Sequence, residues 1–503
     1  MYAWMQHCLR GALLSSLLFG WASAEEYAVQ HEKGSCCPPS YEFGWGTTDA
    51  PRLPNQAELM EKHSLSPGLQ ITEENADLIK DLVPDSVYQR TKNGDYIFTI
   101  GQFDPPDLMN RIWDPTFYES TKNNIGKYGM DDMNGIVDAS GKRPFPMPLG
   151  YPYPELDFTE ENSKIAAKII WNAQASANST CNEVDDPGAK LFTGPRDGGY
   201  ERLLDLHVIR QLIEFRRSPI QIKRPVIFQE IFYFLAPSDV FGVAQLSWRW
   251  ADPTKNDSVW IYSPAVRRMR RLTAANRSEG ILGTEFALDD AEPIYAGKVE
   301  MMDWKFLGVK ASLLPVSRKV GQAPEDYVAR ITNQGLPSTH YTYKKVPGSF
   351  MPPYQDLHFG YQDDSKKYAA WWTVNMLWVP VPMYVLEATP KDPYYNYGKQ
   401  IYEFEPHLFI PGWKQAYNRA GEYWRTILLW IEYTRFMREG KLNVCSDARA
   451  AIAVDDKVNR GTVIMADGGL AAGKGQHLDT HYVPTGLVPA QQFDLSRFLE
   501  LGR

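Results

Sequence analysis

Short runs in which hydrophobic and polar residues alternate dominate the middle of the chain, between Pro225 and Leu314. The first run is PVIFQEIFYFL, and the runs VAQLSWRW, SVWIYSP, VRRMRRLT and MMDWKFLGVK follow, each bounded by Pro, Gly, Asn or Asp. Runs of this length that are rich in β-branched and aromatic residues are typical of consecutive antiparallel strands. Because side chains alternate between the two faces of a strand, this pattern predicts a β-meander with aromatic residues on both faces.

The same pattern predicts strands on both sides of this meander. YIFTIG precedes it, and VPMYVLEATP and GKQIYEFEP follow it. The NRAG sequence at residues 418–421 is typical of a tight turn between the strands KQAY and EYWRTILLW. Residues 201–217, ERLLDLHVIRQLIEFRR, fit a helix or a strand, and their periodicity does not distinguish the two.

Three segments have features of helices. TEENADLIKDLV has Thr72 as a possible N-cap, acidic residues in the first turn and an apolar stripe. The same tetrapeptide returns at Thr159 in FTEENSKIAAKIIWNAQ, and QQFDLSRFLELG predicts a short helix in the tail. Between the first two helices, residues 130–156 form a Pro- and Gly-rich loop, which we expect to have a function or to cover a pocket.

The composition excludes some classes of protein. The chain has 503 residues, of which 13% are aromatic and 23% charged, with a net charge of −8. Since both signs of charge are interspersed, a generally basic nucleic-acid binder is excluded. The aromatic residues favour large, rigid contact surfaces, such as those around apolar ligands or sugars.

The N-terminus predicts export. One Arg, the apolar run GALLSSLLFGW and the small residues Ala22-Ser23-Ala24 form a signal peptide, with cleavage after Ala24. An uncleaved anchor is the alternative. The predicted organisation is therefore a signal peptide at residues 1–24, an irregular arm at 25–70 and a single β-rich domain at 71–503. Within that domain, the strand core spans about residues 219–435 and a Gly-rich tail about residues 465–490.

Four cysteines remain after cleavage: Cys36, Cys37, Cys181 and Cys445. An exported compartment permits disulfides, and four cysteines allow three pairings. Adjacent cysteines form a strained bridge, so we expect a disulfide from the N-terminal arm to Cys181 or Cys445. There is no CxxC motif and the His residues are scattered, so we predict no metal site.

An ordered set of segments resembles a known family. SVWIYSPAVRRMRR, MMDWKFLG, VLEATP, GKQIYEFE and QAYNRAGEYWRT together resemble the exported Gram-negative family called domain of unknown function 1329, over roughly residues 70–435. That family is often labelled outer membrane lipoprotein-sorting protein and looks related in fold to the periplasmic carriers of the Lol pathway. The resemblance implies a mainly β (α+β) fold, in which a strongly curved antiparallel sheet forms an incomplete β-barrel. Helices would pack in or over its concave side, around an apolar cavity.

Aromatic and basic side chains in the predicted strands are the candidate ligand-binding residues. The arginines of VRRMRRLT suit an acidic headgroup or a partner. The alternatives are that they protect an edge strand from aggregation or pair with the acidic residues at 289–292. The aromatic residues either line a cavity or form ordinary core. The candidate ligand-binding residues are Trp248, Trp250, Trp260, Tyr262, Arg268, Arg270, Trp304, Phe306 and Tyr384.

Two further motifs carry little weight. GGLAAGKG at 468–475 nearly matches a phosphate-binding loop, but Gly475 stands where Ser or Thr would hold magnesium, so we expect a flexible loop. His477 and His481 have metal-ligand spacing only on a helix, which the flanking Gly and Pro oppose. No catalytic residue and no cofactor is predicted.

The preferred hypothesis is a periplasmic binding or carrier protein for a hydrophobic, lipid-like molecule that serves envelope transport. Its partners would be that molecule and an envelope transporter or outer-membrane component, with no nucleic acid. The alternatives are an exported enzyme or enzyme-complex subunit that acts on a hydrophobic substrate, and a structural envelope protein whose barrel is filled by side chains. An enzyme is the less favoured of the first two hypotheses.

Overall fold

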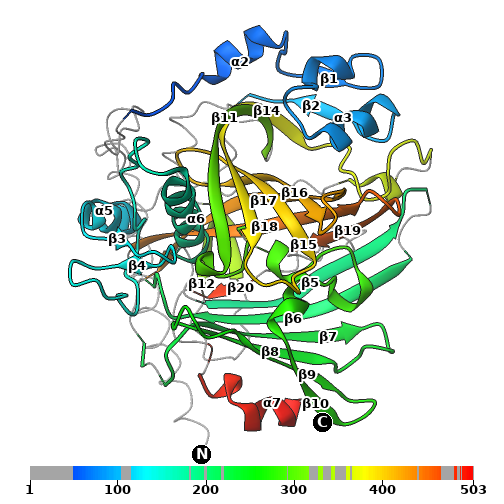
Figure 1. Ribbon diagram of the computed structural model, residues 1–503. Coiled ribbons are helices and arrows are strands. Elements are labelled where there is room, and N and C mark those ends of the chain that lie inside the picture. Colours follow the sequence, from blue (N-terminus) through cyan, green and yellow to red (C-terminus); the bar gives the residue numbers. More distant parts are fainter. Residues whose placement is uncertain are drawn as a thin grey trace, which may run out of the picture.

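One large antiparallel sheet organises the molecule (Figure 1). In the computed structural model its described strands form an 18-stranded sheet. The structure describes residues 49–102, 115–179, 183–197, 201–216, 220–221, 223–291, 293–316, 327–331, 341–345, 358–362, 365–438, 441–465, 481–483, 488 and 490–501.

The main run of the sheet has the spatial order β10-β9-β8-β7-β6-β5-β19-β18-β17-β16-β15-β14-β11, and every neighbouring pair in it is antiparallel. Most neighbours in sequence are therefore neighbours in space. The bounds of these strands are β5 Glu183–Pro195, β6 Arg202–Leu212, β7 Val226–Ala236, β8 Ala244–Trp250, β9 Ser258–Ser263, β10 Arg268–Leu272, β11 Met302–Val316, β14 Leu377–Pro390, β15 Tyr397–Phe404, β16 Pro411–Asn418, β17 Tyr423–Arg438, β18 Lys441–Asp455 and β19 Arg460–Met465.

Shorter strands extend this run. Strand β2 pairs in parallel with the start of β14 and also with β1, while β20 pairs with β5. The hairpin β12–β13 adds to β17, and β3–β4 form a separate two-stranded sheet. Their bounds are β1 Gln70–Ile71, β2 Phe98–Ile100, β3 Gly129–Met130, β4 Ile136–Val137, β12 Tyr327–Ile331, β13 Tyr341–Lys345 and β20 His481–Val483.

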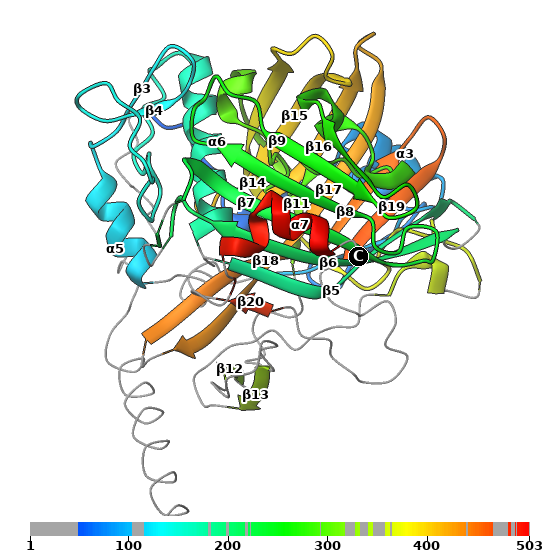
Figure 2. The ribbon, with the colours of Figure 1, turned by 90° about the horizontal axis from the view of Figure 1, so that it is seen from below.

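The described helices lie on both faces of the sheet. The longest, α6, packs against β11 and β18 on the concave face. Helices α2, η1 and α3 cover the opposite, convex face at one end, and α7 covers it at the other, where Figure 2 shows α7 crossing the strands. Their bounds are α2 Gln56–Lys62, η1 Ala76–Ile79, α3 Asp85–Lys92, α5 Pro115–Asn124, α6 Asn162–Ser179, η6 Gly360–Gln362, η8 Ala490–Phe493 and α7 Leu495–Leu501.

The sheet does not close into a barrel. Strand β10 pairs only with β9, and β11 pairs only with β14, among the described strands. Residues 273–301, which we call the strap, connect these two edge strands across the concave side. The strap contains the short 3₁₀ helices η2 Ala274–Ser278, η3 Ile281–Gly283, η4 Leu288–Asp290 and η5 Val299–Met301.

The structure confirms the predicted fold class and the first four strands of the central meander, β7 to β10, whereas β11, which contains MMDWKFLGVK, pairs with β14 and not with β10. The mainly β architecture, the curved antiparallel sheet that stays open and the helix on its concave side are all present. Residues 201–217, which fitted helix or strand, contain strand β6, and the predicted turn at 418–421 joins β16 to β17. The second TEEN segment leads into α6, and the tail forms η8 and α7.

Two local predictions were wrong. No α-helix follows Thr72, because the Asn75 side chain accepts the Thr72 N–H at 2.8 Å and donates to the Gln70 carbonyl, which holds a turn. Only the 3₁₀ helix η1 forms there, and the α-helix begins later, after Pro84. Arg267, which we placed in a strand with its neighbours, lies in the β9–β10 turn with φ of 50°.

Candidate functional site

An apolar cavity of about 170 Å³ lies between the concave face of the sheet and the strap. One wall comes from strands β5 to β7 and the other from β17 to β19, so the two halves of the curved sheet face each other across it. Leu206 and Val208 of β6 and Phe228 and Phe232 of β7 belong to the first wall. Leu429, Ala451 and Ile464 belong to the second, and Ile281, Phe286, Leu288 and Ala291 of the strap form the roof.

Strand alternation explains which side chains reach this cavity. In β7, Phe228, Glu230 and Phe232 point into it, while Ile231 packs on the opposite face under α7. Since side chains alternate along a strand, a single run of hydrophobic residues supplies both the cavity wall and the convex core. The run PVIFQEIFYFL is hydrophobic on both faces for this reason.

One ion pair lies in the wall of the cavity. Glu230 is 5% exposed and accepts hydrogen bonds from the guanidinium of Arg210 on the neighbouring strand. The same guanidinium lies over the Phe228 ring, 5.4 Å from its centroid. The cavity is therefore mostly apolar with one polar end, which is the composition expected of a small-molecule site.

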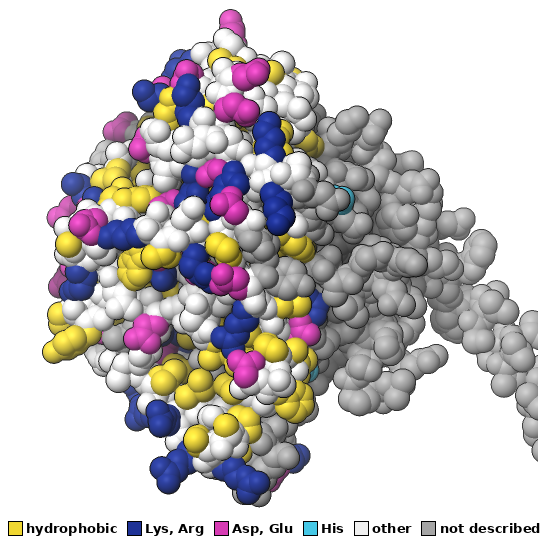
Figure 3. Space-filling view, turned by 90° about the vertical axis from the view of Figure 1, so that its right-hand side faces the viewer, with side chains coloured by type: hydrophobic (Ala, Val, Ile, Leu, Met, Phe, Trp, Pro, Cys, Tyr) yellow, Lys and Arg dark blue, Asp and Glu magenta, His cyan; other side chains and the backbone are white. Residues whose placement is uncertain are grey.

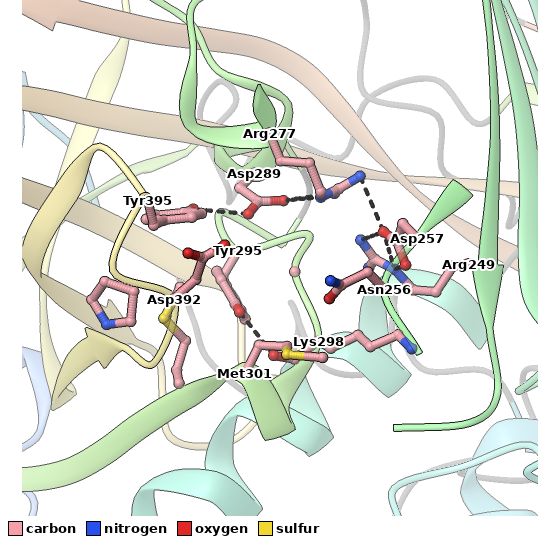
Figure 4. A pocket seen from close by; sticks show the side chains of 13 residues that line it. Arg249, Asn256, Asp257, Arg277, Asp289, Tyr295, Lys298, Met301, Asp392 and Tyr395 are labelled. Carbon is pink, nitrogen blue, oxygen red and sulfur yellow. Dashed lines mark hydrogen bonds and ion pairs between the residues drawn. The ribbon is translucent and has the colours of Figure 1, made fainter. Parts of the chain in front are cut away.

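A second, smaller cavity of about 60 Å³ adjoins this one, and Arg277 of the strap borders both (Figure 4). Arg277 contacts Asp289 at 2.6 Å and Asp257 at 3.3 Å. Arg249 of β8 binds Asp257 at 2.8 Å, and the Tyr395 hydroxyl donates to Asp289 at 2.8 Å. Two arginines, two aspartates and Tyr395 thus form a continuous chain of contacts between β8, the β8–β9 turn, the strap and the β14–β15 turn.

The electrostatics of this network keep Asp257 and Arg277 charged. Burial alone would raise the pKa of Asp257, but the charges of Arg249 and Arg277 outweigh burial and hold that pKa below its ordinary value. Burial would lower the pKa of Arg277, and Asp289 and Asp257 raise it instead. The nearby Lys298 has the opposite balance: burial lowers its pKa to about 8. Its ammonium donates to the carbonyls of residues 252 and 255.

Four acidic side chains fasten the strap along its length. Asp289 belongs to the network above, and Asp290 binds Lys414 of β16 at 2.6 Å with both side chains fully buried. Glu285 accepts hydrogen bonds from Thr193 and Thr462 and pairs with Arg460. Glu300 pairs with Arg143, which also binds Glu214. A buried ion pair needs well-placed partners to offset its desolvation, so these contacts fix the position of the strap more than they add to stability.

At one position of the strap only glycine fits, because another part of the strap backbone lies very close to it. Gly280 and Ala287 form an isolated bridge that folds the strap back on itself. A Cβ on Gly280 would lie 1.7 Å from the Thr284 carbonyl oxygen, which leaves room only for hydrogen. The bend that this bridge makes places Ile281 and Phe286 over the cavity.

The nine predicted ligand-binding residues lie in separate places, and none lines either of these two cavities. The first group packs on the convex face: the Trp248 and Trp260 rings are 4.7 Å apart, and the Trp248 indole donates to the Phe493 carbonyl below α7. Tyr262 belongs to the same cluster. Trp250 is half-buried under the Lys255 ammonium.

The other predicted residues form two more groups. Trp304, Phe306 and Tyr384 pack in the concave core, where Phe306 contacts Phe158, next to α6. Arg268 and Arg270 are exposed on β10, which is an edge strand. Their predicted alternative partners, Asp289 and Asp290, are bound to Arg277 and Lys414 instead.

The remaining candidates fall largely outside the described residues. Cys36, Cys37 and Cys181 lie there, as do the signal peptide, the GGLAAGKG segment and His477, while the backbone of Cys445 is in β18. His481 is in strand β20, so the HLDTH segment does not form the helix that a metal site would need. The described residues contain no group of three or more His, Cys, Asp or Glu that could hold a metal ion.

The strap and its arginine and acidic residues were not predicted from the sequence. Asp289 and Asp290 were considered only as possible partners of the β10 arginines. The sequence offers one indication of these residues. An acidic pair in a segment without strand alternation indicates a loop, and buried charges in a loop need partners. Nothing in the spacing shows that those partners are Arg277 and Lys414.

No helix in the described part of the chain combines the length and the apolar character that crossing a membrane requires. No curated protein matches the chain. Among solved structures, a putative outer membrane lipoprotein-sorting protein domain from Vibrio parahaemolyticus is 15% identical, with a TM-score of 0.41, covering 68% of this chain and 100% of that one.

Two further solved structures are similarly distant. A DUF1329 family protein from Desulfovibrio piger is 12% identical, with a TM-score of 0.40, covering 67% of this chain and 100% of that one. The LolA superfamily protein NE2245 from Nitrosomonas europaea is 14% identical, with a TM-score of 0.35, covering 66% and 98%. Similarities this low support no inference about a ligand.

The family comparison is stronger. The family described as protein of unknown function (DUF1329) matches residues 70–476, which include every strand of the main run and the whole strap. The chain belongs to the DUF1329 family.

Proposed function

We propose that this chain is an exported, periplasmic binding or carrier protein for a small hydrophobic or amphipathic molecule. The observation that carries the proposal is the apolar cavity of about 170 Å³ under the strap. Well-packed protein interiors contain few voids larger than a water molecule. An apolar cavity of this size is unfavourable for water and favourable for an apolar guest.

The volume limits the cargo. An apolar cavity of about 150 Å³ in another protein accepts benzene. A cavity of about 170 Å³ therefore accepts one aromatic ring or a short alkyl chain. Each CH₂ group removed from water contributes about 0.8 kcal/mol, so such a guest gains a few kcal/mol from burial. A long-chain lipid would fit only if the strap moved away from the sheet.

The polar end limits the chemistry. Arg210 and Glu230 face the cavity as a pair, so a guest with a carboxylate or hydroxyl could exchange hydrogen bonds with them while its apolar part contacts Phe228 and Phe232. Guests of this kind suit a carrier that serves envelope transport. In that role, the protein releases its guest to a transporter or to an outer-membrane component.

The first test is native mass spectrometry of the protein purified from the cell envelope, followed by solvent extraction. We expect a stoichiometric small hydrophobic compound that is released on denaturation. The apo protein should then bind benzene and six-carbon carboxylates, measured by NMR titration. A clean apo mass together with no binding of these probes would contradict the proposal.

A matched pair of variants locates the site. Ala291 in the cavity roof and Ala311 on the convex side of β11 are both partly buried. Ala291→Phe should fill the cavity and weaken probe binding at least tenfold, whereas Ala311→Phe should leave it within about twofold. Equal losses in both variants would place the guest elsewhere.

A further inference from the structure

Exposed hydrophobic side chains lie in and beside two turns at one end of the sheet. In the β7–β8 segment, Phe241 is 64% exposed and Leu235 is 42% exposed, and in the β9–β10 turn Val266 is 55% exposed. These are three of the eight large hydrophobic side chains that are exposed among the described residues. Large apolar side chains that gather at exposed turns indicate an interaction surface.

The register of the strands brings these two turns together. Tyr233 at the end of β7 pairs with Ala244 of β8, which pairs with Tyr262 at the end of β9. A Cβ on Gly242 would lie 3.4 Å from the ring of Pro264, so the two turns are in contact. We call the exposed side chains of Leu235, Phe241 and Val266 the apolar tip.

Arginines flank the apolar tip. Arg267, Arg268 and Arg270 are exposed, and within the described part of the chain none of them forms an ion pair. Asp239, the acidic residue of the β7–β8 turn, is already bound to Arg202 at 2.8 Å. Figure 3 shows this side of the molecule, with hydrophobic and basic side chains side by side near its lower end. The local charge is therefore positive although the whole chain has a net charge of −8.

We propose that the apolar tip and these arginines form a docking surface for an anionic lipid membrane. Hydrophobic side chains at such a surface enter the boundary between headgroups and acyl chains, and the guanidinium groups bind the lipid phosphates. This inference goes beyond the carrier function and does not depend on the cavity, because the cavity lining includes none of these residues.

The shape of the surface favours a membrane over a protein partner. A stable protein interface buries about 800 Å² on each partner and is built around a well-packed core. The apolar tip consists of three side chains at the ends of two turns, with charged residues immediately beside them. A bilayer accepts projecting apolar side chains without a complementary pocket, and its anionic lipids complement the arginines.

The experiment is flotation of the purified full chain with vesicles of phosphatidylglycerol and phosphatidylethanolamine, and with vesicles of phosphatidylcholine alone. We expect binding to the anionic vesicles that weakens as salt is raised, and at least tenfold weaker binding to the neutral ones. No binding to the anionic vesicles would overturn the proposal.

Variants separate the two contributions. Phe241→Ser should weaken binding to anionic vesicles about tenfold, since a large apolar side chain no longer enters the bilayer. The double variant Arg268→Gln/Arg270→Gln should weaken it about 25-fold, since each arginine near an anionic surface contributes about fivefold. All these side chains are exposed, so the melting temperature should not change.

Matched controls lie elsewhere on the surface. Tyr394 is 79% exposed, and the Arg52 side chain is 83% exposed. Tyr394→Ser and Arg52→Gln should bind the anionic vesicles as the wild type does. Binding that depends on the arginines but is unchanged in Phe241→Ser would indicate attraction by charge alone and overturn the docking surface. Equal losses of vesicle binding in Tyr394→Ser and Arg52→Gln would also overturn the docking surface.

Discussion

The two faces of the sheet are packed in different ways. On the convex face, Trp372, Trp378 and Trp413 stack with ring centroids 5.4 and 5.5 Å apart and ring planes within 7°. All three are buried, and neither of the two cavities borders them. On the concave face, the strap leaves an apolar cavity and is held by buried ion pairs. The convex face is therefore filled by stacked rings, whereas the concave face keeps a cavity, which the proposed function assigns to a guest.

The largest effect is expected from the convex face. Trp378→Ala removes the central ring of the stack, and we expect it to lower the free energy of unfolding by about 3–5 kcal/mol, because a large cavity would remain in a rigid core. Guanidinium denaturation followed by circular dichroism measures this change. Cavity-binding probes should stabilise the variant and the wild type by the same amount, since they bind on the other face and do not fill the space left by the ring.

Trp378→Phe is the matched control. The Trp378 indole N–H is buried and has no hydrogen-bond partner in the described structure. Replacing the indole by a phenyl ring removes that unsatisfied donor and keeps most of the apolar area, so the loss should stay below about 2 kcal/mol. A loss as large as that of Trp378→Ala would mean that the rigidity of the convex face does not come from ring packing.

The second effect concerns the anchor of the strap. Asp290→Asn leaves the Lys414 ammonium fully buried without its counter-charge, and we expect a loss of about 3 kcal/mol in the free energy of unfolding. The Tyr397 hydroxyl, which donates to Asp290 at 2.9 Å, also loses a charged acceptor. Denaturant titration measures the loss, and limited proteolysis should cut the strap before the sheet.

A double variant tests the origin of that loss. In Asp290→Asn/Lys414→Met neither charge of this buried pair remains, so most of the lost stability should return. Stability that stays as low in the double variant as in Asp290→Asn would show that the hydrogen bonds of Asp290, and not its charge, hold the strap.

The comparison also explains how much the sequence could predict. Strands β7 to β9 were predictable because alternation is a local pattern, and the tight turn at 418–421 has a local signature. The helix expected after Thr72 was wrong because a side-chain amide, Asn75, competes for the backbone there. Local rules fail where one side chain offers the backbone a different partner.

The candidate site was less predictable than the fold. Aromatic residues such as Trp248 and Trp304 fit a cavity wall as well as they fit a core, and only the tertiary structure shows that they pack in separate clusters. The strap depends on pairs far apart in sequence, such as Asp290 with Lys414, which spacing cannot reveal. Whether the nine predicted residues contact a ligand stays a prediction, and the cavity residues are now the stronger candidates.

The smallest effect concerns pH and Lys298, beside the smaller cavity. Burial lowers the pKa of Lys298 from 10.5 to about 8 in the folded state. Below pH 8 the folded chain therefore contains a buried ammonium, which lowers the free energy of unfolding. Between about pH 8 and 10.5 the unfolded chain binds more protons at this site than the folded chain does, so this group favours folding more as pH rises. We expect the stability difference between wild type and Lys298→Met to shift in favour of the wild type by about 2.5 kcal/mol across this range. Taking the difference cancels the titration of the buried tyrosines, which both proteins share.

Denaturation of wild type and Lys298→Met at pH 7.5, 9 and 10.5 measures this shift in stability. A difference that is constant with pH would mean that the concave face keeps Lys298 as well solvated as a surface lysine.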